Sequence, residues 1–155
     1  MPFNKDFGPL NLAMVHRYCR ELAKLYKSHC QNNTRIFHYC SSSDKAKMTH
    51  ACFLMGAFML VVLKMTADEA YERFHEYDQV LLPFRDASKG DCAYKCTVHA
   101  CLQGLEFALK QNWYEFDKFD AREYEHYEKV ENGDLNWIIP GKFMAFMGPV
   151  DRDQR

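Results

Sequence analysis

A run of apolar residues from Ala51 to Leu63 (ACFLMGAFMLVVL) constrains the fold of this chain more than any other stretch. It is about 13 residues long and Lys64 ends it, whereas a helix needs about 20 apolar residues to cross a bilayer. A helix that is apolar on all sides is normally buried in a protein interior. The run therefore predicts a buried central helix and argues against a membrane span.

Length, charge and cysteine usage bound the class of protein. At 155 residues and 48% hydrophobic content, the chain is one domain with enough apolar surface to bury a core. Its net charge of −1 argues against general nucleic-acid binding, which needs a basic face. The first residues, MPFNKDFGPL, lack the pattern of a signal peptide, and the seven cysteines show no tight repeated spacing. We expect a reduced intracellular protein.

Apolar spacing predicts further helices at Gly8 to about Ser28, Thr66 to about Glu76 and Cys92 to about Lys110. β-Branched and aromatic residues predict short strands over Thr34–Cys40 and Phe143–Gly148. This order predicts an α/β fold in which a small sheet is packed by several helices around the buried central helix. Because two strands are too few to bury that helix, we expect further strands on the N-terminal side and interpret the chain as a fragment.

Acidic residues are concentrated between Glu115 and Asp134. This segment contains eight acidic and three basic residues, a local balance of 3 − 8 = −5, whereas the whole chain carries only −1. Asp120 and Glu123 have the spacing of a helix capping box, and Asn132-Gly133 is typical of a helix stop. We therefore expect an acidic helix between these two signals, which concentrates negative potential and attracts cationic partners.

Three carboxylates of this segment are candidate ligands for a cation. Glu125 and Glu128 are three residues apart and share one face of the expected helix, and Asp134 follows the stop and can fold back toward them. Such a set would bind the side chain of a Lys or Arg in a peptide. The alternative is a solvated acidic helix, which composition alone favours because acids suit a helix start.

The expected strand, polar loop and buried helix around Cys40 have the layout of a phosphate site, since a helix N-terminus offers free N–H groups. A cysteine-dependent phosphatase also needs an Arg six residues after its nucleophile, to clamp the phosphoryl oxygens. None of the seven cysteines has that Arg. Lys45 and Lys47 do not replace the planar guanidinium fork. The favoured interpretation of Cys40 is a thiol at a strand end, and a nucleophile is the alternative.

Cys92, Cys96 and His99 step by four and three residues within the third further helix that we expect. Three such ligands on one helix face could hold Zn²⁺. The same positions also suit a buried stripe, in which Cys behaves as a small apolar residue. The stripe is the favoured interpretation, and a zinc site is the alternative.

Several segments are similar to a known family. They are Phe3–Val15, Leu82–Ser88, the twelve residues EYEHYEKVENGD from Glu123 to Asp134, and Leu135–Trp137 with Pro140–Phe143. All resemble the non-catalytic N-terminal domain of the cell-division-cycle-fourteen family of dual-specificity protein phosphatases. The likeness covers nearly all of the chain.

The resemblance implies a tandem of two dual-specificity-phosphatase-like domains, of which the first has an inactive loop and the second does the chemistry. Their interface forms an acidic groove for phosphoserine-Pro substrates that carry a Lys or Arg three residues downstream. The family's groove pattern, Glu-x2-Glu-x5-Asp, falls on Glu125, Glu128 and Asp134. The resemblance thus favours substrate recognition over the solvated helix.

Expectations for the whole chain follow from this resemblance. Residues 1–150 would be the N-terminal domain, truncated at its start and lacking the catalytic domain, and residues 151–155 a polar tail. The chain would be inactive alone and would need no cofactor or metal. Its partners would be the C-terminal catalytic phosphatase domain and phosphoprotein substrates, without nucleic acid or membrane. The family's locations are the nucleus and nucleolus, the cytoplasm and the spindle or centrosome. The alternative is a stand-alone, non-catalytic module that binds basic peptides or partner proteins.

Two departures from the family pattern bear on the alternatives. The loop between Cys40 and Cys52 differs from the usual Arg-x-Asn-Ala-Ala of the family. Cys96 and His99 stand where the family usually has apolar helix positions. The second departure favours the buried stripe over zinc.

Overall fold

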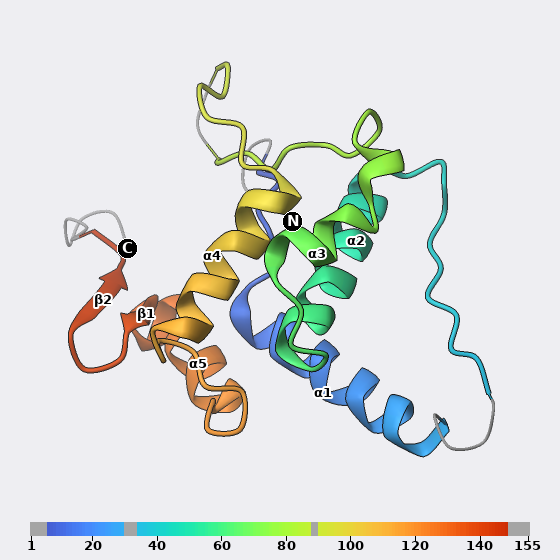
Figure 1. Cartoon of the computed structure of the whole chain (residues 1–155). Coiled ribbons are helices and arrows are strands. Elements are labelled where there is room, and N and C mark those ends of the chain that lie inside the picture. The colour runs from blue at the N-terminus through green and yellow to red at the C-terminus, as the bar shows by residue number, and fades with distance from the viewer. Residues whose placement is uncertain (1–5, 30–33, 88–89, 149–155) are drawn as a thin grey trace.

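Helices dominate the computed structural model, which describes residues 6–29, 34–87 and 90–148 (Figure 1). The α-helices are α1 (Leu12–His29), α2 (Lys45–Val61), α3 (Ala67–Glu72), α4 (Val98–Lys110) and α5 (Ala121–Tyr127). Short 3-10 turns follow α3 and α5, as η2 (His75–Tyr77) and η3 (Val130–Asn132). The strands β1 (Leu135–Ile139) and β2 (Phe143–Phe146) form an antiparallel two-stranded sheet. The predicted α/β class with a small sheet is confirmed.

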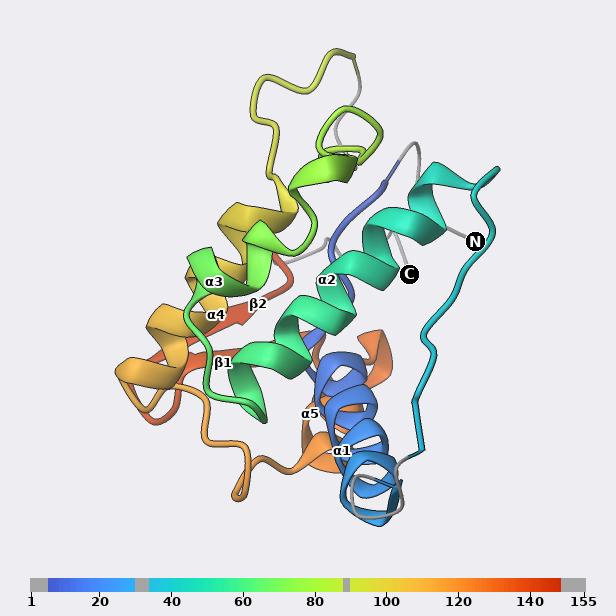
Figure 2. The same ribbon diagram turned by 45° about the vertical axis from the view of Figure 1, so that its right-hand side comes forward.

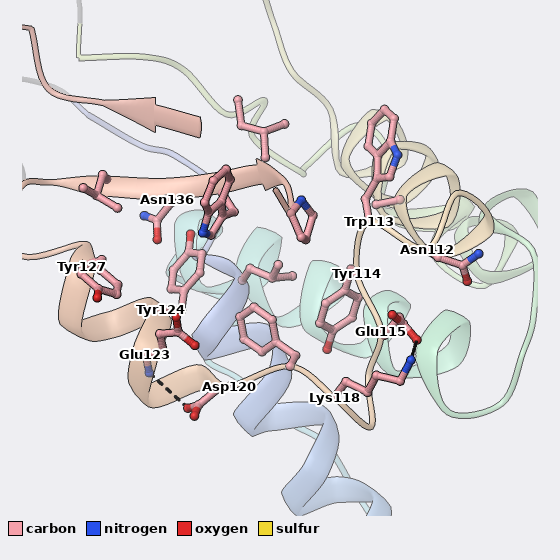
Figure 3. Close-up of a pocket in the computed structure, with 17 residues that line it drawn as sticks. Asn112, Trp113, Tyr114, Glu115, Lys118, Asp120, Glu123, Tyr124, Tyr127 and Asn136 are labelled. Atoms are coloured by element: carbon pink, nitrogen blue, oxygen red, sulfur yellow. Dashed lines mark hydrogen bonds and ion pairs between the residues drawn. The ribbon is translucent and has the colours of Figure 1, made fainter. Parts of the chain in front are cut away.

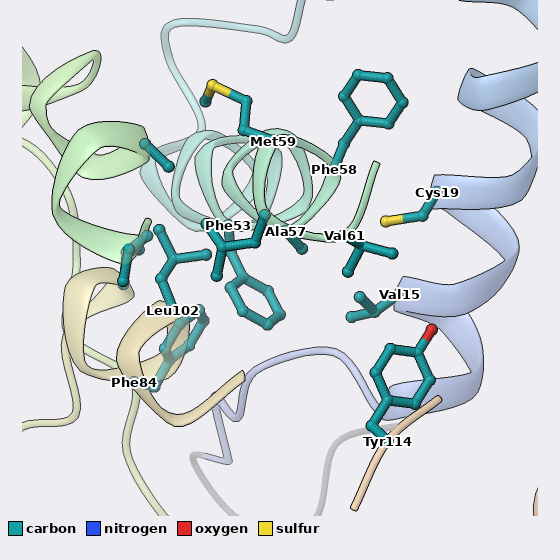
Figure 4. Close-up of a cluster of buried hydrophobic side chains, with 14 residues drawn as sticks. Val15, Cys19, Phe53, Ala57, Phe58, Met59, Val61, Phe84, Leu102 and Tyr114 are labelled. Atoms are coloured by element: carbon teal, nitrogen blue, oxygen red, sulfur yellow. The ribbon is translucent and has the colours of Figure 1, made fainter. Parts of the chain in front are cut away.

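Helix α2 is the centre of the fold, as the apolar run predicts. It packs against α1, α3 and α4, and its side chains Phe53, Ala57 and Val61 lie inside the buried cluster (Figure 4). Asp44 caps the helix by accepting a hydrogen bond from the backbone N–H of Lys47 at 3.0 Å. The prediction of a buried central helix is confirmed. Within the described ranges, no helix is both long and apolar enough to cross a membrane.

Helices α2 and α4 approach closely where Gly56 faces Leu102. A Cβ atom at Gly56 would lie 2.7 Å from Cδ1 of Leu102, a distance that real Cβ atoms do not show. Leu102 is fully buried, so the bare backbone of Gly56 is what admits its side chain to the core. Packing of this kind at native density leaves little room for an extra methyl group.

Three extended segments are tied together beside α2. Phe7 and Arg85 exchange backbone hydrogen bonds of 3.3 and 2.8 Å, and Phe84 and Cys96 exchange bonds of 2.7 and 3.3 Å. The ring of Phe84 is buried and lies 5.1 Å from that of Phe7. Buried Thr49 of α2 reaches the same region, because its hydroxyl accepts a hydrogen bond from the backbone N–H of Leu82 at 2.9 Å.

The strand that we predicted at Thr34–Cys40 is wrong. This segment is extended but forms no β-ladder with any described residue, and it runs along the outside of the helices (Figure 2). Its side chains are exposed, with Phe37 at 77% and Tyr39 at 90%. β-Branched and aromatic residues favour a strand where a neighbouring strand pairs with them and other residues cover one face. No described residue pairs with this segment as a strand, and its side chains are exposed.

The predicted helix boundaries shift for identifiable reasons. Helix α1 begins after Asn11, whose side-chain oxygen accepts a hydrogen bond from the backbone N–H of Met14 at 2.9 Å, so the predicted start at Gly8 is too early. The helix predicted from Thr66 to about Glu76 is α3, which a capping box of Thr66 and Glu69 begins and which already ends at Glu72. Helix α4 begins after the Thr97 cap and not at Cys92.

The final predicted strand is present but pairs with a strand that the sequence reading missed. Leu135 lies opposite Phe146 and Trp137 opposite Met144, with an irregularity before Ile139. A Pro-Gly pair, Pro140-Gly141, follows β1, and Gly141 has a φ of +71°. The predicted tail, residues 151–155, lies outside the described residues.

Candidate functional site

The acidic segment folds as the short helix α5, which packs on the first half of α1. Asp120 caps the helix by accepting hydrogen bonds from the backbone N–H groups of Arg122 and Glu123, at 2.8 and 3.1 Å. These bonds lower the pKa of the Asp120 carboxyl, because they favour its charged form. The Asp120 half of the predicted capping box is confirmed, whereas the return bond from the Glu123 side chain is absent among the described residues, and α5 already ends at Tyr127.

The predicted stop at Asn132-Gly133 ends η3 and not α5. Gly133 has a φ of +114°, the left-handed conformation that favours glycine. The side-chain amide of Asn132 donates to the backbone carbonyl of His126 at 2.7 Å and so ties this turn to α5. The turn thereby brings the start of the hairpin back toward the helix.

Glu125 is held by an arginine from the other end of the sequence. Nε of Arg17 donates to Oε1 of Glu125 at 2.9 Å, and Nη2 donates to Oε2 at 2.6 Å. The side chains are partly exposed, at 50% for Arg17 and 38% for Glu125. The guanidinium lowers the pKa of the Glu125 carboxyl, chiefly through this hydrogen bonding. A fork of two parallel bonds fixes the carboxylate plane as well as its position.

Glu128 is held by Asn11 through a single nitrogen atom. The side-chain amide nitrogen of Asn11 donates to both carboxylate oxygens, at 3.0 Å to Oε1 and 2.8 Å to Oε2. Asn11 also caps α1 with its side-chain oxygen, so one residue both starts α1 and orients the second carboxylate. Glu125 of α5 and Glu128, the residue that follows this helix, therefore both bond to residues at the start of α1.

Asp134 is positioned by backbone and not by a side-chain partner. Its backbone N–H donates to the carbonyl of Lys129 at 3.0 Å, and its carbonyl accepts from the backbone N–H of Met147 at 3.0 Å. Its φ is +47°, a conformation that Asp tolerates better than most residues. Within the described part of the chain, its half-buried carboxylate has no hydrogen bond or ion pair.

An open pocket of about 460 Å³ lies on another side of α5, between this helix, β1 and the segment after α4 (Figure 3). Aromatic side chains line it, including Trp113, Tyr124 and Trp137. Glu123 is one of its carboxylates, whereas Glu125, Glu128 and Asp134 do not line it. The predicted carboxylate set is thus separate from this hollow, and Glu123 provides a natural comparison for it.

Cys40 is exposed at the end of the extended segment, so it is not a strand-end thiol. It shares a second pocket, of about 330 Å³, with His38 and Cys52. Burial, and then the nearby Cys40, raise the pKa of the Cys52 thiol to about 11. The side chains that line this pocket include neither Arg nor Lys, so it lacks the guanidinium clamp that a cysteine-dependent phosphatase needs.

The interpretation of Cys92, Cys96 and His99 as neighbours on one helix face is wrong. Only His99 lies in α4, because the Thr97 cap starts that helix. His99 contacts Asp68 at 2.7 Å, and the Cys96 sulfur contacts that of Cys101 at 3.4 Å. In residues 6–29, 34–87 and 90–148, no group of three or more His, Cys, Asp or Glu side chains could hold a metal ion.

Sequence reasoning missed Arg17 and Asn11. They lie 108 and 117 positions before their carboxylate partners, so no local pattern could pair them. The one available signal is that Asn11 precedes an apolar stripe, as a helix-capping residue does.

Comparison with known proteins gives consistent matches. A family model described as the N-terminal half of dual specificity protein phosphatases matches residues 1–108. The mouse dual specificity protein phosphatase CDC14A is 53% identical over 148 residues, which cover 95% of this chain and 24% of that protein. The Caenorhabditis elegans tyrosine-protein phosphatase cdc-14 is 40% identical over 154 residues, covering 96% and 22% respectively.

The matches extend across the acidic segment. Since the similarity to mouse CDC14A covers 95% of the chain, it includes residues 125–134, although the family model ends at residue 108. The human CDC14A phosphatase, at 51% identity, is matched over 25% of its length. The chain therefore spans about a quarter of the length of these relatives.

Proposed function

Because this chain belongs to the family of dual-specificity protein phosphatase N-terminal halves, with CDC14 phosphatases as its relatives, we propose that it is the substrate-recognition half of such an enzyme. In this proposal, Glu125, Glu128 and Asp134 bind a Lys or Arg side chain of the substrate. A catalytic phosphatase domain, as partner, removes the phosphate from a phosphoserine-Pro site three residues upstream.

The observation that carries the proposal is the fixed orientation of two carboxylates at the C-terminal end of α5. Both oxygens of Glu125 accept hydrogen bonds from Arg17, and both oxygens of Glu128 accept from Asn11. A carboxylate that is already oriented loses less side-chain entropy when a ligand arrives. Glu128 is therefore oriented to receive a cation without reorganising α5, whereas Glu125 must first exchange its Arg17 partner for the ligand.

Asp134 supports the proposal because its carboxylate has no bonding partner among the described residues. The backbone around it is fixed by hydrogen bonds to Lys129 and Met147 and by the left-handed turn at Gly133. A half-buried carboxylate without a partner in the described residues gains from an incoming ammonium or guanidinium, which supplies a charge-assisted hydrogen bond. Among the three carboxylates, that of Asp134 is therefore the one that can bind a ligand without giving up a partner among the described residues.

The proposal is tested in the complete phosphatase that carries this chain as its N-terminal half. Two phosphoserine-Pro peptides differ only in having Lys or Ala three residues downstream, and a small aryl phosphate reports on the chemistry. Glu128→Gln and Asp134→Asn should each lower kcat/KM for the Lys peptide by about tenfold, the worth of one hydrogen bond to a charged group. Turnover of the Ala peptide and the aryl phosphate should stay unchanged.

Glu123→Gln is the matched control, because it removes one negative charge from the same helix on the side of the aromatic pocket. It should leave the Lys-over-Ala preference intact. Equal losses on all three substrates, or an equal effect of Glu123→Gln, would count against recognition of the basic residue by the proposed set.

A further inference from the structure

Two cysteines meet at the beginning of α4. Cys96 is the residue before the Thr97 cap, and Cys101 is the fourth residue of the helix. These are the two positions that form a hydrophobic staple, in which the side chain before the cap packs on the first turn. In this chain both members of the staple are thiols, and their sulfur atoms lie 3.4 Å apart.

Backbone hydrogen bonds fix the main chain at both cysteines. The backbone of Cys96 is paired with that of Phe84, through bonds of 2.7 and 3.3 Å, and the Phe84 ring is buried in the core. The backbone N–H of Cys101 donates to the carbonyl of Thr97 at 3.1 Å. The local fold therefore places the two cysteines so that their sulfur atoms can meet.

The pair has the features of a site for reversible oxidation. A disulfide has an S–S distance of about 2.05 Å, so the two sulfur atoms need to approach by little more than 1 Å. Both side chains are only partly buried, so a small oxidant can reach them. Neither residue belongs to the carboxylate set of the proposed function.

We propose that Cys96 and Cys101 are a redox modification site, which hydrogen peroxide converts into a disulfide that staples the start of α4. The Cys96 thiolate attacks the peroxide O–O bond, which gives a sulfenic acid on Cys96 and releases hydroxide. The Cys101 sulfur then attacks the sulfenic sulfur, the S–S bond forms, and the hydroxyl group leaves as water with the thiol proton. In total, two thiols are oxidised and one peroxide is reduced to two waters.

The environment of the two sulfurs supports this order of attack. Burial, and then the hydrogen bond with Cys96, raise the pKa of the Cys101 thiol. Since the thiolate is the nucleophile, Cys101 is a poor first attacker of peroxide. It is well placed as the resolving thiol, because its sulfur already contacts that of Cys96.

Other cysteines of the described chain provide comparisons. Cys92 donates its thiol hydrogen to the backbone carbonyl of Tyr94, and its sulfur contacts no other sulfur atom of the described residues. Cys19 is fully buried, and burial raises the pKa of its thiol to about 12. The proposal therefore predicts selective oxidation of the Cys96–Cys101 pair before these residues.

Tryptic digestion isolates the pair cleanly. Cleavage after Lys95 and Lys110 gives the peptide CTVHACLQGLEFALK, which contains Cys96, Cys101 and no other cysteine, and Cys92 falls in the preceding peptide. The folded chain is treated with hydrogen peroxide, alkylated with iodoacetamide, digested and analysed by mass spectrometry. The 96–110 peptide should lose the mass of two hydrogen atoms and take no alkyl group, whereas the Cys92 peptide should be alkylated. If the oxidised chain is reduced with dithiothreitol before alkylation, the 96–110 peptide should carry two alkyl groups.

Single substitutions test the order of events. In Cys101→Ser, dimedone should trap a sulfenic acid on Cys96, and in Cys96→Ser the remaining Cys101 should stay alkylatable. Cys92→Ser should leave the oxidation of the 96–110 peptide unchanged. Oxidation should also raise Tm in the unaltered chain and in Cys92→Ser, but not in Cys96→Ser. Full alkylation of the 96–110 peptide after excess peroxide, or dimedone labelling of Cys101 in Cys96→Ser, would overturn the proposal.

Discussion

Arg17 of α1 binds Glu125 of α5 through two hydrogen bonds, of 2.9 and 2.6 Å, across 108 positions of sequence. The arginine is a residue of the kind that we propose Glu125 to recognise in a substrate. An internal cation on a receptor carboxylate competes with an external one, because both satisfy the same oxygens. The two members of this ion pair should therefore have opposite effects on recognition.

The first prediction uses that opposition. In the complete phosphatase, Glu125→Gln should lower kcat/KM for the peptide with a downstream Lys several-fold, since the carboxylate is lost. Arg17→Gln should raise it several-fold, since Glu125 is released to the ligand. The Ala peptide should respond to neither change. If both substitutions weaken turnover of the Lys peptide equally, the pair only joins α1 to α5 and Glu125 is not a receptor for the ligand.

The second prediction concerns Thr49, whose buried hydroxyl links α2 to the segment before Phe84. It accepts from the backbone N–H of Leu82 and donates to the carbonyl of Lys45, both at 2.9 Å. Thr49→Val keeps the shape but leaves the Leu82 N–H unpaired, which should lower the free energy of unfolding by about 1–3 kcal/mol. Thr49→Ser keeps the hydroxyl and should cost clearly less. Urea denaturation of both variants checks this, and equal losses would contradict the role of the hydrogen bond.

Local patterns allowed the centre of the fold to be predicted from the sequence. The apolar run predicts α2 because no arrangement other than burial satisfies an apolar surface on every side. The caps at Thr66 and Asp120 are also local, since each acts on backbone groups two or three residues away. Interactions of this kind are encoded within a few residues and can be read without knowing the rest of the structure.

Long-range relationships could not be predicted in this way. Thr34–Cys40 has strand composition, but a strand exists only with a partner, and partners are set by the whole chain. Likewise, Glu125 and Glu128 could be selected from the sequence, whereas Arg17 and Asn11, which orient them, could not. The orientation of a candidate site is therefore the part that requires the structure.

The third prediction concerns Gly56 and Leu102. The Leu102 side chain occupies the space between α2 and α4 that a Cβ atom at position 56 would need. Leu102→Ala should lower the free energy of unfolding by about 2–5 kcal/mol, because it opens a cavity in the core. Gly56→Ala alone should also destabilise, because overpacking costs about 1–3 kcal/mol and exceeds the gain of up to about 1 kcal/mol in helix propensity. In the Leu102→Ala background, Gly56→Ala should instead raise the free energy of unfolding, since the new methyl group then enters free space. A double-mutant cycle measures this coupling, and additive effects would contradict the contact.

The fourth prediction concerns His16, a buried residue of α1 whose Nδ1 is hydrogen bonded to the hydroxyl of Tyr114 at 2.9 Å. Its Nε2 has no hydrogen bond within the described part of the chain, and the rings of Phe116 and Phe119 lie about 5 Å away. Burial lowers the pKa of His16, and the positive charges of Arg20 and Arg17 lower it further. The folded chain therefore keeps this imidazole neutral at pH values where the unfolded chain protonates it.

The sign of the pH dependence follows from this difference. The unfolded histidine has a pKa of about 6.5, so below that pH the unfolded state binds the proton first. The free energy of unfolding should be constant above about pH 6.5 and should fall as the pH drops from there to the lowered pKa of the folded state. One proton limits the slope from His16 to about 1.4 kcal/mol per pH unit. His16→Phe should remove this contribution, and Tyr114→Phe should keep it while lowering stability overall. Urea denaturation between about pH 7.5 and pH 5.5 checks the slope. An unchanged slope in His16→Phe would contradict the assignment of the pH dependence to this residue.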